Sequence, residues 1–142
     1  MSIPLPFTIS GTTIPGKRLG SELGFPTANL AYPPGIDLPP DGVYVAEAQT
    51  GGRRYLAILN QGRHPTAPEG RATIESHLLG YAGGDLYGQA LTLKYLHYLR
   101  PERHFPTLEA LKAQLTADER DALAWARQRR PDLAPLPADP KP

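Results

Sequence analysis

The chain has no cysteine among its 142 residues, and it has only one methionine and one tryptophan. Disulfide bonds and thiolate metal sites are therefore excluded, although the lack of cysteine does not identify a cellular compartment. The four histidines do not recur at the spacing of metal ligands, so a zinc site built on histidine is not expected.

Long apolar runs and an excess of either charge are missing too. No stretch approaches the length of a transmembrane helix, and residues 1–6 lack the basic start and apolar run of a signal peptide. The 15 Lys and Arg residues nearly balance the 14 Asp and Glu residues, and they are scattered. We therefore expect a cytoplasmic, monomeric, single-domain protein that binds neither membranes nor nucleic acid.

The segment from Gly16 to Asn29 combines three evenly spaced glycines with small oxygen-bearing side chains. Glycine lets the backbone take positive φ or approach a ligand closely, and bare amides can hold phosphate oxygens. Lys17 and Arg18 add positive charge. The spacing fits neither the phosphate loop that ends in Gly-Lys-Ser/Thr nor the Rossmann fingerprint. The segment therefore indicates a nucleotide site of another kind.

Pro26 restricts the backbone where the chain leaves this segment. Because proline pushes the preceding residue toward an extended conformation, residues 27–29 are predicted to be strand-like. The Thr27 hydroxyl and the Asn29 amide oxygen would then point to the same side. Two neutral oxygens suit Mg²⁺ that takes its other ligands from water and substrate phosphates. The alternative is a Gly/Pro turn with a satisfied Asn29, and spacing alone leaves both open.

Alternating apolar and polar residues predict a mainly β fold of short strands. The predicted strands cover residues 7–13, 27–29, 42–50, 53–60, 72–79 and 89–99. In residues 72–79, the alternation places Glu75 on one face with Thr73 and His77. In residues 89–99, the alternation of apolar and polar residues continues to Leu99. About six strands at this spacing favour a closed barrel over a sandwich, because closure removes the sheet edges.

Two helices are predicted after the last strand. Thr107 can cap the first, and residues 116–119 fit a capping box that opens a second helix running to Arg130. The proline-rich tail over residues 131–142 is expected to be disordered, which leaves residues 1–130 as the folded domain.

Six blocks of sequence resemble the ATP-dependent riboflavin kinases (flavokinases), whose hallmark is Pro-Thr-Ala-Asn after a glycine-rich loop. The blocks occur in the family's order at residues 20–30, 38–44, 60–66, 75–79, 85–88 and 100–111. The resemblance implies a six-stranded Greek-key closed barrel with C-terminal α-helices. It also implies transfer of the γ-phosphate of ATP to the 5′-hydroxyl of riboflavin, which gives FMN and ADP with Mg²⁺ as the metal.

The resemblance also implies roles for particular residues. Glu75 would be the catalytic base, in place of the solvated strand carboxylate that a lone Glu usually is. Thr27 and Asn29 would hold Mg²⁺. The implied nucleotide-binding residues are Gly16, Lys17, Gly20, Gly24, Pro26, Thr27 and Asn60, and the implied flavin-binding residues are Asn29, Arg100, Glu102 and Phe105.

Several of these residues have a structural alternative. Asn60 could close a turn, and Arg100 could belong to a strand-to-helix junction with a surface salt bridge. His77 could serve as a base, but a hydrogen-bonded barrel histidine is the preferred interpretation. Trp125 is expected to pack in the core rather than to stack on flavin.

Three positions depart from the family pattern. Ser21 stands where Arg or Lys is common, Gln61 replaces a small aliphatic residue, and Gly80 replaces a frequent acidic residue. None of the three removes a residue assigned to the transfer step. A catalytically idle flavin- or nucleotide-binding barrel and a barrel that scaffolds a partner protein are the rival functions.

Many bacterial family members carry an N-terminal nucleotidyltransferase domain that converts FMN to FAD. Here the kinase-like region begins within the first residues after Met1, so the sequence predicts a chain that stops at FMN. Chromatography after a long incubation with riboflavin and excess ATP should show FMN without FAD. FAD accumulating in that incubation would show the prediction to be wrong.

Overall fold

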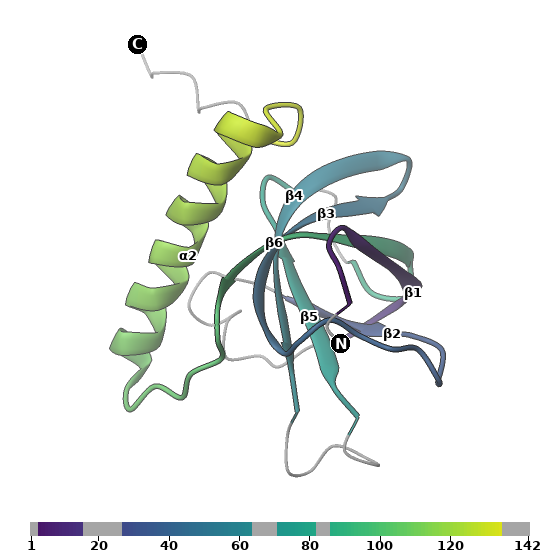
Figure 1. Ribbon diagram of the computed structural model, residues 1–142, viewed down its shortest axis with the longest axis horizontal. Helices are drawn as coiled ribbons and strands as arrows, with labels where there is room; N and C mark the ends of the chain where they lie inside the picture. The colour runs from purple at the N-terminus through teal and green to yellow at the C-terminus, as the bar shows by residue number, and fades with distance from the viewer. Residues whose placement is uncertain (1–2, 16–26, 64–70, 82–85, 135–142) are drawn as a thin grey trace.

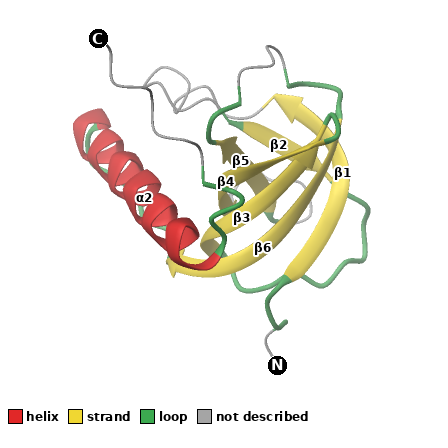
Figure 2. Ribbon diagram, turned by 90° about the horizontal axis from the view of Figure 1, so that it is seen from above, coloured by secondary structure: helices red, strands yellow, loops and turns green. Residues whose placement is uncertain are grey.

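A computed structural model of the protein describes residues 3–15, 27–63, 71–81 and 86–134. Within these residues the chain forms a closed six-stranded β-barrel with one long α-helix on its outside (Figures 1 and 2). The elements are β1 (Phe7–Pro15), β2 (Ala28–Ala31), β3 (Gly42–Thr50), β4 (Arg53–Gly62), β5 (Thr73–Leu78), β6 (Ala90–Arg100) and α2 (Leu108–Arg129). The predicted mainly β barrel is confirmed.

The strands follow one another around the barrel in the order β1-β2-β5-β4-β3-β6, and β6 pairs with β1 to close it. All of the pairings are antiparallel. Gly51 and Gly52, both with positive φ, turn the chain between β3 and β4 as their sequence predicts. Strand β5 pairs with β4, which precedes it in the chain, and also with the distant β2.

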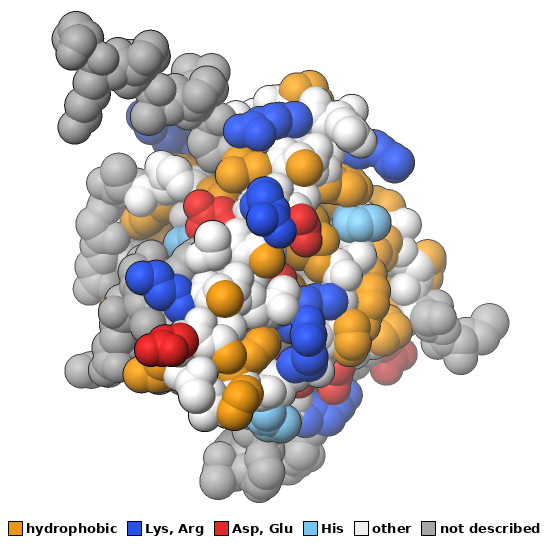
Figure 3. All heavy atoms as spheres, turned by 90° about the vertical axis from the view of Figure 1, so that its left-hand side faces the viewer, with side chains coloured by type: hydrophobic (Ala, Val, Ile, Leu, Met, Phe, Trp, Pro, Cys, Tyr) orange, Lys and Arg blue, Asp and Glu red, His pale blue; other side chains and the backbone are white. Residues whose placement is uncertain are grey.

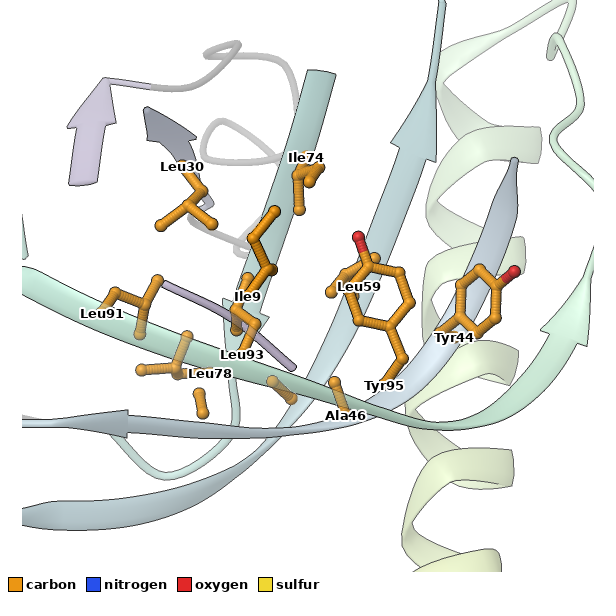
Figure 4. Close-up of a cluster of buried hydrophobic side chains, with 12 residues drawn as sticks. Ile9, Leu30, Tyr44, Ala46, Leu59, Ile74, Leu78, Leu91, Leu93 and Tyr95 are labelled. Atoms are coloured by element: carbon orange, nitrogen blue, oxygen red, sulfur yellow. The ribbon is translucent and has the colours of Figure 1, made fainter. Parts of the chain in front are cut away.

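Apolar side chains fill the inside of the barrel (Figure 4). On β5, Ile74 and Leu78 point into this core, while Thr73, Glu75 and His77 are only partly buried on the opposite side. The predicted division of β5 into two faces is therefore confirmed. The core cluster consists of Ile9, Leu30, Tyr44, Ala46, Ala48, Ala57, Leu59, Ile74, Leu78, Leu91, Leu93 and Tyr95.

A second apolar cluster lies between the outside of the barrel and α2. Val43 and Val45 of β3 contribute to it, whereas Tyr44 belongs to the inner core, so this strand is buried on both faces. Ala122 and Ala126, one helical turn apart, are fully buried in the same cluster. Small side chains at these positions let the helix approach the barrel closely.

The prediction of two C-terminal helices is wrong, because α2 is continuous from Leu108 to Arg129. Thr107 caps it as predicted, with the Ala110 N–H donating to Thr107 Oγ1 at 3.1 Å. No Gly or Pro interrupts residues 108–129. Asp118, part of the predicted capping box, instead lies on the buried side of the helix and binds Arg100.

The predicted alternation of β6 is correct up to Tyr95 and wrong beyond it. Ala46 pairs with Tyr95, but the next residue back, Val45, pairs with His97, so one extra residue enters β6 between them. Such a bulge changes the face that the following side chains occupy, and a second register shift, between the pairs Tyr44–Tyr98 and Val43–Arg100, changes it again. His97 consequently leaves the interior and stacks on Trp125 of α2, with ring centroids 5.5 Å apart. The interpretation of Trp125 as a packing residue is confirmed.

The chain after α2 turns back toward the barrel. Residues 131–134, expected to begin a disordered tail, form a turn in which Leu133 is buried in the second cluster. Residues 135–142 lie outside the described residues.

Surface charges follow the balance of the composition. On the face that carries α2, Lys and Arg side chains are interspersed with acidic and apolar ones (Figure 3). In the part of the chain that the structure describes, no helix combines the length and the apolar character needed to cross a membrane.

Buried tyrosines make the barrel sensitive to alkali. Burial raises the pKa of Tyr44 to about 12, and nearby Tyr98 and Asp41 add to the shift. Burial also raises the pKa of Tyr95 far above its ordinary value. An unfolded tyrosine ionises near pH ~10. The unfolded state therefore loses these protons first, so this stability is fully present below pH ~10 and is lost as the pH rises through the folded-state values.

We predict that the free energy of unfolding falls steeply above pH ~10. Denaturant titrations at increasing pH, with tyrosinate absorbance followed in parallel, measure both quantities. Tyr44 and Tyr95 should ionise only as the barrel unfolds. Ionisation of every tyrosine near pH ~10 in a protein that stays folded would contradict this.

Candidate active site

Polar side chains of three adjacent strands form one row on the outside of the barrel. Glu75 of β5 lies opposite Asn29 of β2 on one side and opposite Asn60 of β4 on the other. Directly opposed residues in antiparallel strands have Cβ atoms about 5 Å apart. The three residues are far apart in the sequence, so strand pairing alone makes them neighbours. We call them the polar row.

Thr27, just before β2, joins the polar row through its hydroxyl. Its Oγ1 donates a hydrogen bond to Glu75 Oε2 at 3.1 Å. This bond holds the Glu75 carboxylate toward β2, on the side where Asn29 lies. The structure thus brings together Thr27, Asn29 and Glu75, whose roles as metal ligands and base stay predictions.

The amide oxygen of Asn29 is buried and has no hydrogen-bond partner among the described residues. Such an oxygen loses the hydrogen bonds that water would give and costs roughly 1–3 kcal/mol unless another group replaces them. A cation is one group that would replace them. The alternative of a satisfied Asn29 in a turn does not describe this residue, which lies within strand β2.

The oxygen chemistry of this corner fits Mg²⁺. Among the described residues no cluster of three or more His, Cys, Asp and Glu side chains could hold a metal. Thr27 and Asn29 offer neutral oxygens beside the carboxylate of Glu75. A hard cation that keeps waters and shares ligands with phosphates suits such an incomplete set.

Asn60 is exposed, and it lies within β4, which continues to Gly62. The alternative in which Asn60 closes a turn is therefore wrong. Two residues further on the same strand, a Cβ atom added to Gly62 would lie 1.9 Å from Glu102 Oε1. A side chain there would displace the Glu102 carboxylate, so Gly62 lets this carboxylate lie directly against β4.

Arg100 points its guanidinium at the helix. Its Nε and Nη2 donate to the two carboxylate oxygens of Asp118 at 2.8 and 2.7 Å. Its side chain is 14% exposed and that of Asp118 is 3% exposed. The junction that was the alternative for Arg100 is therefore present, but as a buried ion pair rather than a surface one. Phe105 lies close, with its ring centroid 5.9 Å from the guanidinium carbon of Arg100.

His77 also faces the helix. It lies two residues from Glu75 on the same side of β5, and its Nε2 is 3.9 Å from Glu119 Oε2 of α2. His77 thus borders the polar row at the edge where the helix meets β5.

The glycine loop of the predicted site is not among the described residues. Gly16, Lys17, Gly20, Gly24 and Pro26 lie outside the described residues. Their role toward the nucleotide stays a prediction, as does the effect of Ser21.

Two residues of this region carry interactions that sequence reasoning missed. Gln61 was noted only as a departure, but it is fully buried inside the barrel. Its amide donates to the Pro39 carbonyl and to Asp41, and its oxygen accepts from the Tyr95 hydroxyl at 2.8 Å. Asp118 was assigned to a cap, and no spacing rule indicates that it pairs with Arg100. Both partnerships depend on the tertiary fold.

A surface pocket of about 620 Å³ lies beyond the end of β2. Tyr32, Arg63, Arg71 and Ala72 contribute to its lining, with residues 34–38. None of the described site residues lines it. This pocket is therefore separate from the polar row.

Comparison with known proteins connects this arrangement to an enzyme family. The family model described as "Flavokinase: Riboflavin kinase" matches residues 3–126. The bifunctional riboflavin kinase/FMN adenylyltransferase of Pseudomonas fluorescens is 40% identical over 122 residues, which are 85% of this chain and 39% of that protein. The chain thus spans about two fifths of the length of the curated relatives it matches.

Solved structures share the same architecture. A structure described as a macrolide-efflux protein from Streptococcus pneumoniae matches with a TM-score of 0.76 and 29% identity, covering 84% of this chain and 39% of that one. Riboflavin kinase from Trypanosoma brucei matches with a TM-score of 0.64 and 22% identity, covering 96% of this chain and 94% of that one. At 22% identity, the likeness to the Trypanosoma brucei structure shows a shared fold alone.

Proposed function

The chain belongs to the flavokinase family, the riboflavin kinases, and we propose that it transfers the γ-phosphate of ATP to the 5′-hydroxyl of riboflavin. The products are FMN and ADP. The observation that supports this most directly is the polar row, in which Glu75 lies between Asn29 and Asn60 and accepts a hydrogen bond from Thr27.

Phosphoryl transfer asks a protein chiefly to position the reactants and to stabilise charge. In the proposed reaction, the 5′-hydroxyl of riboflavin donates a hydrogen bond to the Glu75 carboxylate. The hydroxyl oxygen bonds to the γ-phosphorus, the bond from that phosphorus to the β,γ-bridging oxygen breaks, and ADP leaves with the bond electrons. Glu75 takes the hydroxyl proton. The hydrogen bond from Thr27 keeps the carboxylate oriented for this role.

Thr27 and Asn29 are proposed to hold Mg²⁺. When bound, the ion supplies neutralisation of the phosphate charge. The buried oxygen of Asn29, which has no hydrogen-bond partner among the described residues, supports this assignment. Thr27 is hydrogen-bonded to Glu75, which is the strand partner of Asn29.

The remaining roles are the ones that the family resemblance implies, and the position of each residue near the polar row is compatible with them. Asn60 adjoins Glu75 and is proposed to contact the nucleotide, together with the glycine loop. Glu102 and Phe105 lie on the connection from β6 to α2, and we propose that this connection borders the flavin. Asn29 and Arg100 complete the proposed flavin side.

A non-catalytic flavin- or nucleotide-binding barrel is the alternative from a different class. Chromatography of a reaction with riboflavin, ATP and Mg²⁺ separates the two, because a kinase forms FMN and ADP in equal amounts. Flavin binding without FMN formation would favour the non-catalytic barrel, and no flavin binding at all would favour a protein scaffold.

We also propose a monomer located in the cytoplasm, as the family resemblance leads us to expect. Sedimentation measures the oligomeric state directly. A stable dimer at low concentration would overturn the first part of this proposal.

The metal site yields one prediction. Since Thr27 and Asn29 are neutral, most of the Mg²⁺ affinity should come from the phosphates. Calorimetry should therefore show weak binding of Mg²⁺ to the protein alone and much stronger binding with ADP present. Asn29→Ala should lower turnover more than it weakens riboflavin binding. Tight binding of Mg²⁺ without nucleotide would refute this account of the site.

The second prediction concerns the base. Glu75→Gln keeps the size and polarity of the side chain but cannot accept a proton, so kcat should fall by about 10²- to 10⁴-fold. Binding of FMN and ADP should stay nearly unchanged. His77→Gln, two residues away on the same face, is the matched control and should cost much less. If Glu75→Gln kept near wild-type kcat with chemistry rate-limiting, the base would lie elsewhere, with His77 next to be tested.

A further inference from the structure

The connection between β6 and α2, residues 101–107, is tied to the helix by a set of polar contacts centred on Asp118. This carboxylate accepts from Arg100 through both of its oxygens and from Gln114 Nε2 at 2.8 Å. Asp118 is only 2% exposed. A buried charge with three charge-assisted or polar contacts stabilises one geometry strongly and tolerates little displacement.

Gln114 extends the same contacts back to the connection. Its Oε1 accepts from Arg103 Nη2 at 2.9 Å while its Nε2 donates to Asp118. The connection is thus tied at its start by Arg100 and in its middle by Arg103. We call Asp118, Gln114, Arg100 and Arg103 the Asp118 cluster.

Phe105 lies near both arginines of the cluster. The guanidinium carbons of Arg100 and Arg103 are 5.9 and 6.0 Å from its ring centroid. At these distances a cation is attracted to the face of an aromatic ring. The position of Phe105 therefore depends on where the Asp118 cluster holds the two cations.

The cluster is also joined to the polar row through the sheet. Arg100 pairs with Val43 across β6 and β3, and Val43 pairs with Asn60 across β3 and β4. Asn60 in turn pairs with Glu75. One line of strand partners thus connects the Asp118 cluster to the proposed base.

We propose that Asp118 is a positioning residue for the flavin side of the active site. It holds Arg100 against the helix and, through Gln114 and Arg103, sets the place of residues 101–107 and the Phe105 ring. This inference rests on the proposed function, and in it Arg100 acts by holding the connection rather than as a mobile ligand of the substrate.

Asp118→Asn tests the proposal, because it keeps the shape of the side chain and removes the charge that holds Arg100. Glu47→Gln is the matched control. Glu47 accepts from Arg130 at 2.6 Å at the C-terminal end of α2, so the control makes the same chemical change in another partly buried ion pair of the helix region. Both variants should lose some thermal stability.

The measurements are the Kd for riboflavin from quenching of flavin fluorescence and the KM values for riboflavin and ATP. Asp118→Asn should raise the Kd and KM for riboflavin about tenfold or more, since a small displacement of positioning groups is costly. Its KM for ATP should change by less than about twofold, because the hydrogen bonds of the cluster among the described residues do not reach Thr27 or Asn60. Glu47→Gln should leave all three values near wild type.

Gln114→Ala gives an independent test if Asp118→Asn does not fold, because Gln114 is only partly buried. It should raise the Kd for riboflavin about threefold, in line with the loss of polar contacts. Equal effects of the Asp118 and Glu47 variants, or no effect of the Asp118 and Gln114 variants on riboflavin, would overturn the positioning role. Wild-type protein that binds no riboflavin would overturn the proposed function itself.

Discussion

Strand β5 is hydrogen-bonded on both sides, to β2 and to β4, and the arrangement of the candidate site depends on this double pairing. A slip of one residue in either pairing would turn every β5 side chain to the opposite face. The slip is opposed by the core, because Ile74 and Leu78 would leave the barrel interior and Glu75 would enter it. The same apolar burial that closes the barrel therefore fixes Glu75 between Asn29 and Asn60.

The helix α2 completes the molecule by covering the outside of the barrel beside this row. Its small residues Ala122 and Ala126 pack over the strand face that carries Val43 and Val45. Buried or partly buried ion pairs hold its middle, through Arg100 with Asp118, and its C-terminal end, through Arg130 with Glu47. Apolar packing brings the helix onto the barrel, and the directional ion pairs define its position along it.

Local patterns predicted much of this structure. The alternation of β5 and the cap at Thr107 depend on neighbouring residues, so they could be read from the sequence and are confirmed. The bulge after Tyr95 and the continuity of α2 depend on what each segment packs against, and both were predicted wrongly. The partners of Gln61 and Asp118 come from distant segments that only the folded chain brings together.

For the site, the residue types were predicted and their contacts were not. Pairing of Asn29 and Asn60 with Glu75 requires that β5 lie between β2 and β4, and no periodicity indicates that order. The hydrogen bond from Thr27 to Glu75 likewise depends on that order. The family resemblance supplied the roles, and the barrel supplies a physical reason why these residues can act together.

We propose that phosphoryl transfer takes place at the polar row, and a crystal structure of the protein with riboflavin, ADP and Mg²⁺ can test this. We expect the 5′-hydroxyl of riboflavin within hydrogen-bond distance of the Glu75 carboxylate, with the metal bound to Thr27 and Asn29. Ligands bound away from this row, for example in the pocket beside Tyr32 and Arg71, would contradict it.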